Sequence, residues 1–355
     1  MTTPEIIHAR LVNQQIAETK FSKPEEIVTH LVAMQAQEYA MAKWAIGLRL
    51  PNIFDEDIEQ AFNEGRILRT HIMRPTWHFV SSADIRWMIS LTVPRVNAVN
   101  AFMYRKCELT PKIFSQCNDI IVANLEGNKH LTRATLKSEL EKKIVTGDGV
   151  RLSCIMMQAE LEGIICSGPR DGKQFTYALI DERVPKTRPL TKEESLAELV
   201  KRYFKSRGPA QIEDFVMWSG LTVKDAKAGI SMLPKDFVKE EIDGKNYIYY
   251  PVPAASGKIR STFLMPDYDE YGMSYKDRSA IYSLPPKILD NPKLNIPYNR
   301  MIVVDGQITG SWKRTIKGKE IAIELDFFKK INKKQEQAVQ LAVKKFCSFA
   351  GKNYT

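Results

Sequence analysis

The stretch Asp55–Val80, with the sequence DEDIEQAFNEGRILRTHIMRPTWHFV, predicts a helix followed by a β-hairpin. Residues 55–64 begin with an acidic N-cap candidate and place apolar residues on one helical face, and Gly65 ends the helix. Residues 67–73 and 76–80 then read as two short strands joined by a proline-containing turn. A helix followed by a two-stranded hairpin is the outline of a winged helix.

The same outline recurs twice further along the chain. The second copy has predicted helices at 131–143 and 151–162, and its hairpin strands span 163–168 and 175–179. The third copy has predicted helices at 195–207, 211–219 and 223–232, followed by hairpin strands at 237–241 and 246–250. We therefore expect an α+β protein with three tandem winged-helix modules, at residues 1–110, 111–190 and 191–252.

The C-terminal part of the chain has a different composition, in which short β-type segments predominate. Predicted strands span 258–264, 300–304, 307–313 and 320–328, and an amphipathic helix at 333–349 closes the chain. We expect residues 253–355 to form a small β-barrel-like domain with a terminal helix.

Composition and charge limit the classes of function. The chain has 355 residues, 44% of them hydrophobic, and 52 Lys and Arg against 42 Asp and Glu give a net charge of +10, which favours a polyanionic partner. Five cysteines without C-x-x-C spacing predict neither a disulfide framework nor a zinc site, and they suit a reducing cytoplasm. The sequence contains no secretory leader pattern and no long apolar run, so we expect a cytoplasmic protein that does not span a membrane.

A predicted helix at residues 24–35 brings two glutamines to a helix end. Gln35 and Gln37 are separated by one small residue. Two positions along an ideal helix differ in direction by about 200°, so the amides converge only if the helix ends or deforms here. Spacing alone leaves two explanations open, because the pair could cap a turn or hold a water molecule. The adjacent Glu38 is interpreted as a helix-end or salt-bridge residue.

Other motifs that suggest metal or phosphate chemistry do not meet its requirements. The segment 267–272 begins like a calcium loop, but Arg278 stands where the bidentate glutamate belongs. Residues 168–173 resemble a phosphate loop only faintly, and a hairpin turn explains them better. His71 and His78 have no third ligand at metal spacing. The sequence therefore predicts neither a metal nor a cofactor.

Several blocks of sequence together resemble one protein family. They are LVAMQAQ at 31–37, RPTWHFV at 74–80, PDYDEY at 266–271, and VDG at 304–306 followed by GSWKR at 310–314. This combination, in this order, resembles the AlkZ-like DNA glycosylases built from tandem winged helices. The resemblance covers nearly the whole chain and implies three winged-helix modules around a DNA channel with a C-terminal β-domain.

The resemblance also implies a site. Crosslink-unhooking members of the family carry glutamine, an apolar residue and glutamine, whereas another branch carries aspartate at the last position. Gln35-Ala36-Gln37 matches the first pattern, which implies that Gln35 and Gln37 are catalytic. The implied activity is hydrolysis of the N-glycosidic bond of N7-alkylated purines in double-stranded DNA, with possible extension to bulky adducts or interstrand crosslinks, by a monomeric enzyme.

The chemistry of two amides is consistent with such a substrate. A glycosylase normally uses a carboxylate to stabilise an oxocarbenium-like transition state and to activate water. A glutamine amide has no useful basicity, but it can orient water by accepting a hydrogen bond. This weakness matters less when the leaving base is already cationic, as in a purine alkylated at nitrogen 7. An amide-only site therefore predicts a labile alkylated purine as substrate.

Two further groups of residues are candidates for binding. Candidate phosphate contacts are the basic residues at predicted turns, namely Arg170 and Lys173 in the second hairpin and Lys313, Arg314, Lys317 and Lys319 near the C-terminus. A solvated charged face is the alternative for the C-terminal group. Candidate pocket residues are Tyr39, Trp77, His78, Asp269 and Glu270. A buried core position is the alternative for Trp77.

Two other classes of function compete with the glycosylase. A non-catalytic winged-helix transcriptional regulator or architectural DNA-binding protein would use the same fold, because fold does not determine function. A typical regulator, however, carries one such module and dimerises on paired half-sites. Binding of structured RNA is the third class, and the sequence contains no recognisable motif for it.

Overall fold

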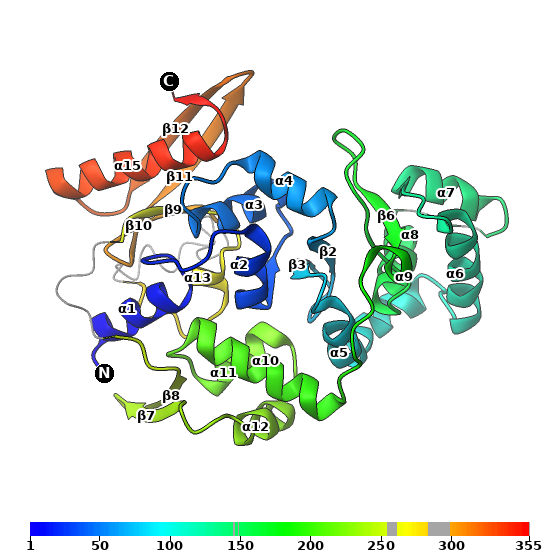
Figure 1. Ribbon diagram of the computed structural model, residues 1–355, viewed down its shortest axis with the longest axis horizontal. Helices are drawn as coiled ribbons and strands as arrows, with labels where there is room; N and C mark the ends of the chain where they lie inside the picture. Colours follow the sequence, from blue (N-terminus) through cyan, green and yellow to red (C-terminus); the bar gives the residue numbers. More distant parts are fainter. Residues whose placement is uncertain (145, 148, 254–260, 283–298, 355) are drawn as a thin grey trace. The chain divides into compact units, whose positions relative to one another are not determined.

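The computed structural model describes residues 1–144, 146–147, 149–253, 261–282 and 299–354 (Figure 1). The chain divides into two compact units. The first comprises Met1–Glu59, Ala197–Trp218 and Thr222–Thr355, and the second comprises Gln60–Leu196 and Ser219–Leu221. The chain passes between the units within helices α4 (Asp55–Asn63) and α10 (Lys192–Arg207), and again on either side of the short segment Ser219–Leu221. The expected division into four domains, at residues 110, 190 and 252, stays a prediction.

The first unit contains most of the helices near the N-terminus and all of the C-terminal strands. Its helices are α1 (Thr3–Asn13), α2 (Pro24–Leu31), α3 (Tyr39–Leu48), α11 (Ile212–Ser219), α12 (Val223–Ser231), α13 (Glu270–Met273) and α15 (Lys333–Phe349). Its strands are β1 (Ala33–Gln35), β7 (Val238–Ile242), β8 (Lys245–Tyr249), β9 (Phe263–Met265), β10 (Met301–Val304), β11 (Gln307–Lys317), β12 (Glu320–Phe327) and β13 (Asn353–Tyr354).

The C-terminal sheet has the strand order β13-β12-β11-β10-β9. Closure into a barrel requires the two outer strands to pair with each other. Here β13 has only 2 residues and β9 only 3, and within the described residues each lies at an edge, so the sheet is open. The prediction of a β-barrel-like domain is therefore wrong, and the C-terminal strands form an open sheet. Residues 258–260 of the first predicted strand lie outside the described residues.

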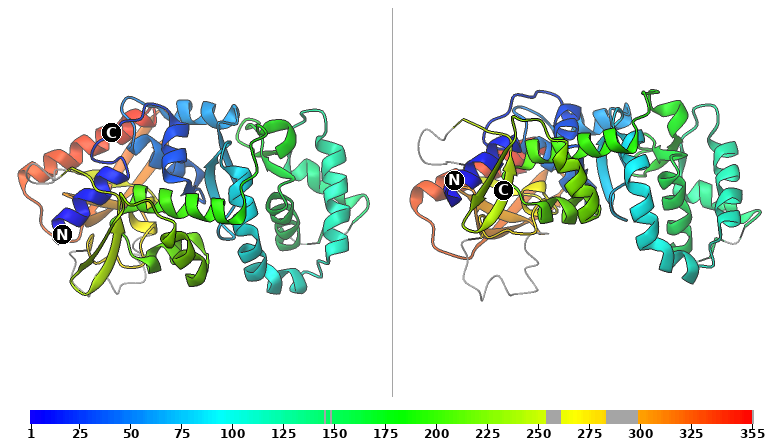
Figure 2. Two further views of the ribbon diagram at one scale, coloured as in Figure 1. Left: turned by 60° about the horizontal axis from the view of Figure 1, so that its bottom comes forward. Right: turned by 90° about the horizontal axis from the view of Figure 1, so that it is seen from below.

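Helix α15 lies along this sheet and completes the core of the first unit (Figure 2). The ring of Phe346 lies 5.1 Å from Trp44 of α3 and 4.9 Å from Trp312 of β11. Both indole N–H groups donate to backbone oxygens of β9, Trp44 to Leu264 at 2.8 Å and Trp312 to Met265 at 2.9 Å. These two bonds satisfy the polar atoms of buried tryptophans, so α3, α15 and the sheet form one packed body.

The second unit consists of helices around two small antiparallel β-structures. Its elements are α5 (Ile85–Lys106), α6 (Pro111–Leu125), α7 (Arg133–Glu141), α8 (Gly149–Leu161), α9 (Ile180–Arg183), and strands β2 (Ile67–His71), β3 (Trp77–Ser81), β4 (Leu131–Thr132), β5 (Ile165–Ser167) and β6 (Thr176–Leu179). Leu125, Leu136, Ile155 and Ile165 belong to the apolar core that joins α6, α7, α8 and β5.

The three predicted hairpins are confirmed as secondary-structure elements. The β2–β3, β5–β6 and β7–β8 hairpins are antiparallel and begin or end within two residues of the predicted strands. Helix α3 was not predicted. Every residue from Met41 to Leu48 is buried, so the segment has no polar face and no amphipathic period to detect. Within the described residues no helix is long and apolar enough to cross a membrane.

Candidate functional site

The two glutamines lie between α2 and α3, beyond a helix that ends earlier than expected. Helix α2 stops at Leu31, four residues before the predicted end, because Val32 has φ +66° and ψ −55°. Gln35 is then the last residue of the short strand β1, whereas Gln37 precedes the N-cap of α3. The side chain of Gln37 is exposed, and Gln35 is 7% exposed.

The turn at Val32 is strained. A β-branched residue rarely adopts positive φ, and this pair of angles corresponds to a γ-turn of the unfavourable hand. Such a conformation costs about 1–3 kcal/mol and persists only where the surroundings enforce it. The turn reverses the chain directly after α2, so it sets the direction in which the Gln35 segment leaves the helix.

The side chain of Arg207, from α10, holds both sides of this turn. Its Nη1 donates to the backbone oxygen of Leu31 at 2.9 Å, and its Nη2 donates to the backbone oxygen of Ala33 at 3.0 Å. The planar guanidinium therefore binds the carbonyls on either side of Val32. Arg207 is fully buried, and its position is itself determined by a carboxylate.

That carboxylate is Glu270, at the first residue of α13. Its Oε2 accepts from Nη2 of Arg207 at 2.7 Å and from the indole of Trp218 at 2.9 Å. Its Oε1 accepts from the backbone N–H of Gln35 at 3.0 Å. Burial alone would raise the pKa of Glu270, but Arg207, the hydroxyl of Ser274 and the Gln35 N–H outweigh burial and hold the pKa at about 2. Glu270 is therefore a stable anion beside β1.

A second buried ion pair neighbours the first. Asp269, the N-cap of α13, accepts a bidentate pair of hydrogen bonds from Arg49 at 2.8 and 2.9 Å. Arg49 also donates to the backbone oxygen of Gln14 at 3.0 Å, which ties α1 to the end of α3. Asp269 and Glu270 thus have protein partners and are buried. That they line a pocket stays a prediction.

The remaining candidate pocket residues occupy both units. Tyr39, in the first unit, donates its hydroxyl to Glu59 at 3.1 Å. Trp77 and His78 begin β3 in the second unit. The ring of Trp77 is half-buried, and His78 is fully buried with its Nδ1 2.9 Å from the backbone oxygen of Thr76. Gln35, Gln37, Tyr39, Asp269 and Glu270 are therefore within one unit, and Gln35 and Glu270 are in direct contact.

The β11–β12 hairpin carries the C-terminal basic candidates. Lys317 pairs with Glu320, so Gly318 and Lys319 form a two-residue turn, and Lys313, Lys317 and Lys319 are exposed. Ile316, next to the turn, is 45% exposed although it is apolar. Arg314 differs from the lysines, because burial lowers its pKa and its guanidinium lies 5.8 Å from the ring of Phe346.

The β5–β6 hairpin carries the other two basic candidates, in the second unit. Lys173 is exposed at the turn. The guanidinium of Arg170 lies over Phe175 at 4.1 Å, and its Nε donates to the backbone oxygen of Gln174 at 3.0 Å. Arg170 thus contacts its own hairpin, whereas Lys173 is exposed.

The residues that sequence reasoning missed are the buried arginines. Arg207 ends a helix that also carries Lys201, Arg202 and Lys205, and Arg49 is the C-cap of α3. A solvated position is the usual interpretation of a basic residue at a helix end. The only signal was the apolar surroundings of Arg49, whose segment reads as almost entirely hydrophobic. Within the described residues, no cluster of three or more His, Cys, Asp or Glu side chains could hold a metal ion.

Comparisons with known proteins agree on one relationship. Residues 28–349 match the family model described as DNA glycosylase AlkZ-like. The chain is 19% identical over 311 residues to an interstrand DNA cross-link repair glycosylase of Streptomyces sahachiroi, covering 81% of each protein. The solved structure of the Streptomyces sahachiroi DNA glycosylase AlkZ has a TM-score of 0.79 to this chain at 17% identity, covering 100% of this chain and 99% of that one.

Proposed function

Because the chain belongs to the AlkZ-like DNA glycosylase family, we propose that it hydrolyses the N-glycosidic bond of N7-alkylated purines in duplex DNA, with Gln35 and Gln37 positioning the attacking water. The observation that carries the proposal is the support of the glutamine segment. The strained turn at Val32 is bound by the buried Arg207, and the backbone N–H of Gln35 donates to the anionic Glu270. The side chain of Gln37 is exposed. Strain that is enforced by surrounding structure is characteristic of functional sites.

The amide pair suits a substrate that needs little acid–base help. A glutamine side chain can accept a hydrogen bond from water and donate one to a substrate oxygen, but it cannot take up a proton at neutral pH. Loss of a cationic 7-alkylpurine neutralises the base and needs no general acid. Water orientation is then the main contribution required of the protein, and rigid backbone at Gln35 provides it.

Crosslinked substrates belong to the same proposal. The relative from Streptomyces sahachiroi is named as an interstrand cross-link repair glycosylase. A crosslink between two N7-alkylated purines presents two cationic leaving bases, so hydrolysis at either one releases the strands from each other. The chain carries the glutamine pair that this chemistry requires.

We assign the remaining candidates as follows within this proposal. Lys313, Lys317 and Lys319 bind phosphates, and the exposed Ile316 contacts the base edges or sugars in a groove. Arg314 supports the hairpin through Phe346. Arg170 orders the β5–β6 turn and Lys173 binds phosphate. Asp269 and Glu270 are positioning residues that act through the backbone, and Tyr39 lies beside the glutamine segment at the start of α3.

The test is base release from duplex DNA that contains 7-methylguanine, detected by strand cleavage at abasic sites after alkali. We expect Gln35→Ala and Gln37→Ala each to reduce the single-turnover rate by about a hundredfold. Gln60→Ala is the matched control, because Gln60 is an exposed glutamine that pairs with Glu64 at 2.7 Å. It should leave the rate unchanged.

The same experiment separates the competing explanations. If the native chain binds the DNA but releases no base above an enzyme-free control, the non-catalytic regulator is favoured. If both glutamine variants retain the native rate per folded molecule and lose thermal stability, the glutamines are turn-forming residues. Affinity for undamaged duplex should be the same for all variants, because the amides act on the transition state.

A further inference from the structure

The second unit contains a cavity that the proposed chemistry of the glutamine pair does not use. It has a volume of about 610 Å³, within the size range of small-molecule sites, and every residue that lines it belongs to the second unit. The lining includes four cations, Arg69, Arg133, Lys137 and Lys173, and no carboxylate among its twelve residues. An anion in this cavity would therefore meet positive and neutral side chains but no negative one among the residues that line it.

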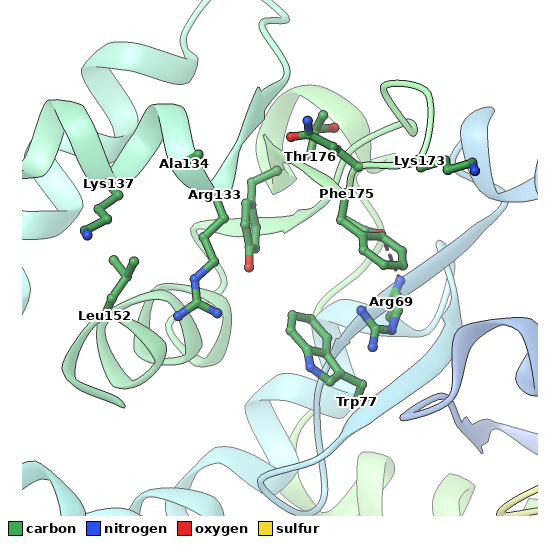
Figure 3. Close-up of a pocket in the computed structure, with 12 residues that line it drawn as sticks. Arg69, Trp77, Arg133, Ala134, Lys137, Leu152, Lys173, Phe175 and Thr176 are labelled. Atoms are coloured by element: carbon green, nitrogen blue, oxygen red, sulfur yellow. Dashed lines mark hydrogen bonds between the residues drawn. The ribbon is translucent and has the colours of Figure 1, made fainter. Parts of the chain in front are cut away.

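The cavity also has aromatic walls. Trp77, Phe175 and Tyr177 contribute rings to the lining. Figure 3 shows Arg133 and Lys137, from helix α7, on one side and Arg69, Trp77 and Phe175 on the other. Arg133 and Lys137 are one helical turn apart, so both can face the same ligand.

Arg69 is built into a stack of alternating rings and cations. Its guanidinium lies 4.2 Å from the ring of Trp77 and 4.7 Å from that of Phe175. Beyond Phe175 lies Arg170, at 4.1 Å, and beyond Trp77 lies His71, with 4.0 Å between ring centroids. Cation–ring contacts of this kind strengthen when they are desolvated, and Arg69 is only 8% exposed.

The stack is anchored at its far end. His71 contacts Glu160 twice. The Oε2 atom of Glu160 lies 2.5 Å from Nδ1 of His71 and accepts a hydrogen bond from the backbone N–H of His71 at 3.0 Å. The backbone N–H of Arg69 donates to Ser167 at 2.8 Å. These bonds keep the stack in place before any ligand arrives, so little ordering is required on binding.

We propose that this cavity binds a nucleotide unit, an aromatic base that carries a phosphate group. The cations on both sides neutralise the phosphate, and the ring edges and Leu152 contact the base. The unit comes either from the end of a DNA strand or from a free nucleotide. The site goes beyond the proposed base release, because neither Gln35 nor Gln37 belongs to the second unit.

The experiment is calorimetric titration of the full chain with 2′-deoxyguanosine 5′-monophosphate, with deoxyguanosine and inorganic phosphate as comparison ligands. We expect the nucleotide to bind at least about tenfold more tightly than either comparison ligand, because only the nucleotide engages both the cations and the rings. Equal binding of inorganic phosphate would overturn the proposal, and so would the absence of nucleotide binding.

Variants locate the site. Lys137→Gln, and Lys137→Gln combined with Arg133→Gln, should weaken nucleotide binding, the double variant by about tenfold or more. Lys142→Gln is the matched control, because Lys142 lies at the C-cap of the same helix, is paired with Glu139 and does not line the cavity. An equal loss in the control would assign the binding to diffuse surface charge and overturn the proposal.

Two further measurements are needed to interpret the binding data. Thermal unfolding checks that each variant is folded. The side chain of Lys137 is 45% exposed and pairs with the equally exposed Glu141 at 3.4 Å, so its replacement does not empty the core. Competition by a 5′-phosphorylated trinucleotide would identify a strand end as the source, whereas its failure to compete, with the mononucleotide bound, would identify a free nucleotide. Base release is not needed for any of these readouts, so a failed glycosylase assay leaves this proposal standing.

Discussion

Replacement of Glu270 by glutamine is expected to disturb the glutamine segment without altering the glutamines themselves. The substitution keeps the shape of the side chain but removes the charge that faces Arg207. Arg207 would remain buried and would still bind the backbone oxygens of Leu31 and Ala33. The Nε and Nη2 atoms of Arg207, which donate to Glu270, would face a neutral amide instead of a carboxylate.

The size of the effect follows from the ion pair. A fall in the pKa of Glu270 from the usual 4.5 to about 2 corresponds to on the order of 3 kcal/mol in favour of the charged, folded form. Removing one partner of a buried pair costs about 3–5 kcal/mol, because the other charge is left uncompensated. We therefore expect Glu270→Gln to lower the free energy of unfolding by about 3 kcal/mol.

The pH dependence has a definite sign. Because the pKa of Glu270 is lower in the folded than in the unfolded chain, its stabilisation is present above about pH 4.5 and is lost as the pH falls toward 2. The native protein should lose this contribution across that range. The Glu270→Gln variant has no such carboxyl, so its stability should fall less steeply over the same interval.

Urea unfolding between pH 3 and 7 measures the stability, and single-turnover release of 7-methylguanine measures the effect on the site. Glu64→Gln is the control, since Glu64 forms an exposed pair with Arg66 at 2.8 Å, and surface pairs contribute about 0–1 kcal/mol. We expect slower base release from folded Glu270→Gln at an unchanged affinity for undamaged DNA. Unchanged stability together with unchanged release would refute the role of Glu270 in holding β1.

Three further outcomes are expected. Replacing Lys317 and Lys319 by glutamine should reduce the slope of log affinity for duplex DNA against log salt by about 2, and an unchanged slope would remove the hairpin from the interface. Gly306→Ala should lower the melting temperature more than Gly318→Ala, because both have positive φ but only at Gly306 would the new Cβ clash with another side chain, that of Ile7. Trp312→Phe should lower the free energy of unfolding by about 1–3 kcal/mol in urea titrations, since the backbone oxygen of Met265 loses its indole donor; no loss would mean that another donor replaces it.

The elements that the sequence determined by itself are those with local signals. The helix at 55–64 and its hairpin were predictable because N-cap, apolar period, glycine and β-branched strands follow one another within thirty residues. The family relationship was also in the sequence, since Gln35-Ala36-Gln37 and the later blocks are short motifs that can be read in order.

The tertiary structure alone decided how that motif is held. Helix α2 was expected to continue to Gln35, because nothing local signals a break at Val32. The break depends on Arg207 and Glu270, which are distant in sequence and meet only in the folded core. Buried ion pairs leave no periodic pattern, since each charge is compensated by a partner that the sequence does not reveal.

The cavity of the second unit and the open C-terminal sheet also depend on contacts between residues that are distant in the sequence. Arg69 and Phe175 belong to different hairpins, and only folding brings the guanidinium against the ring. Whether a sheet closes depends on the length and pairing of its outer strands, and β13 and β9 proved too short. The sequence thus determined the local elements and the glutamine motif, whereas long-range pairing decided the support behind the motif, because such contacts have no local signature.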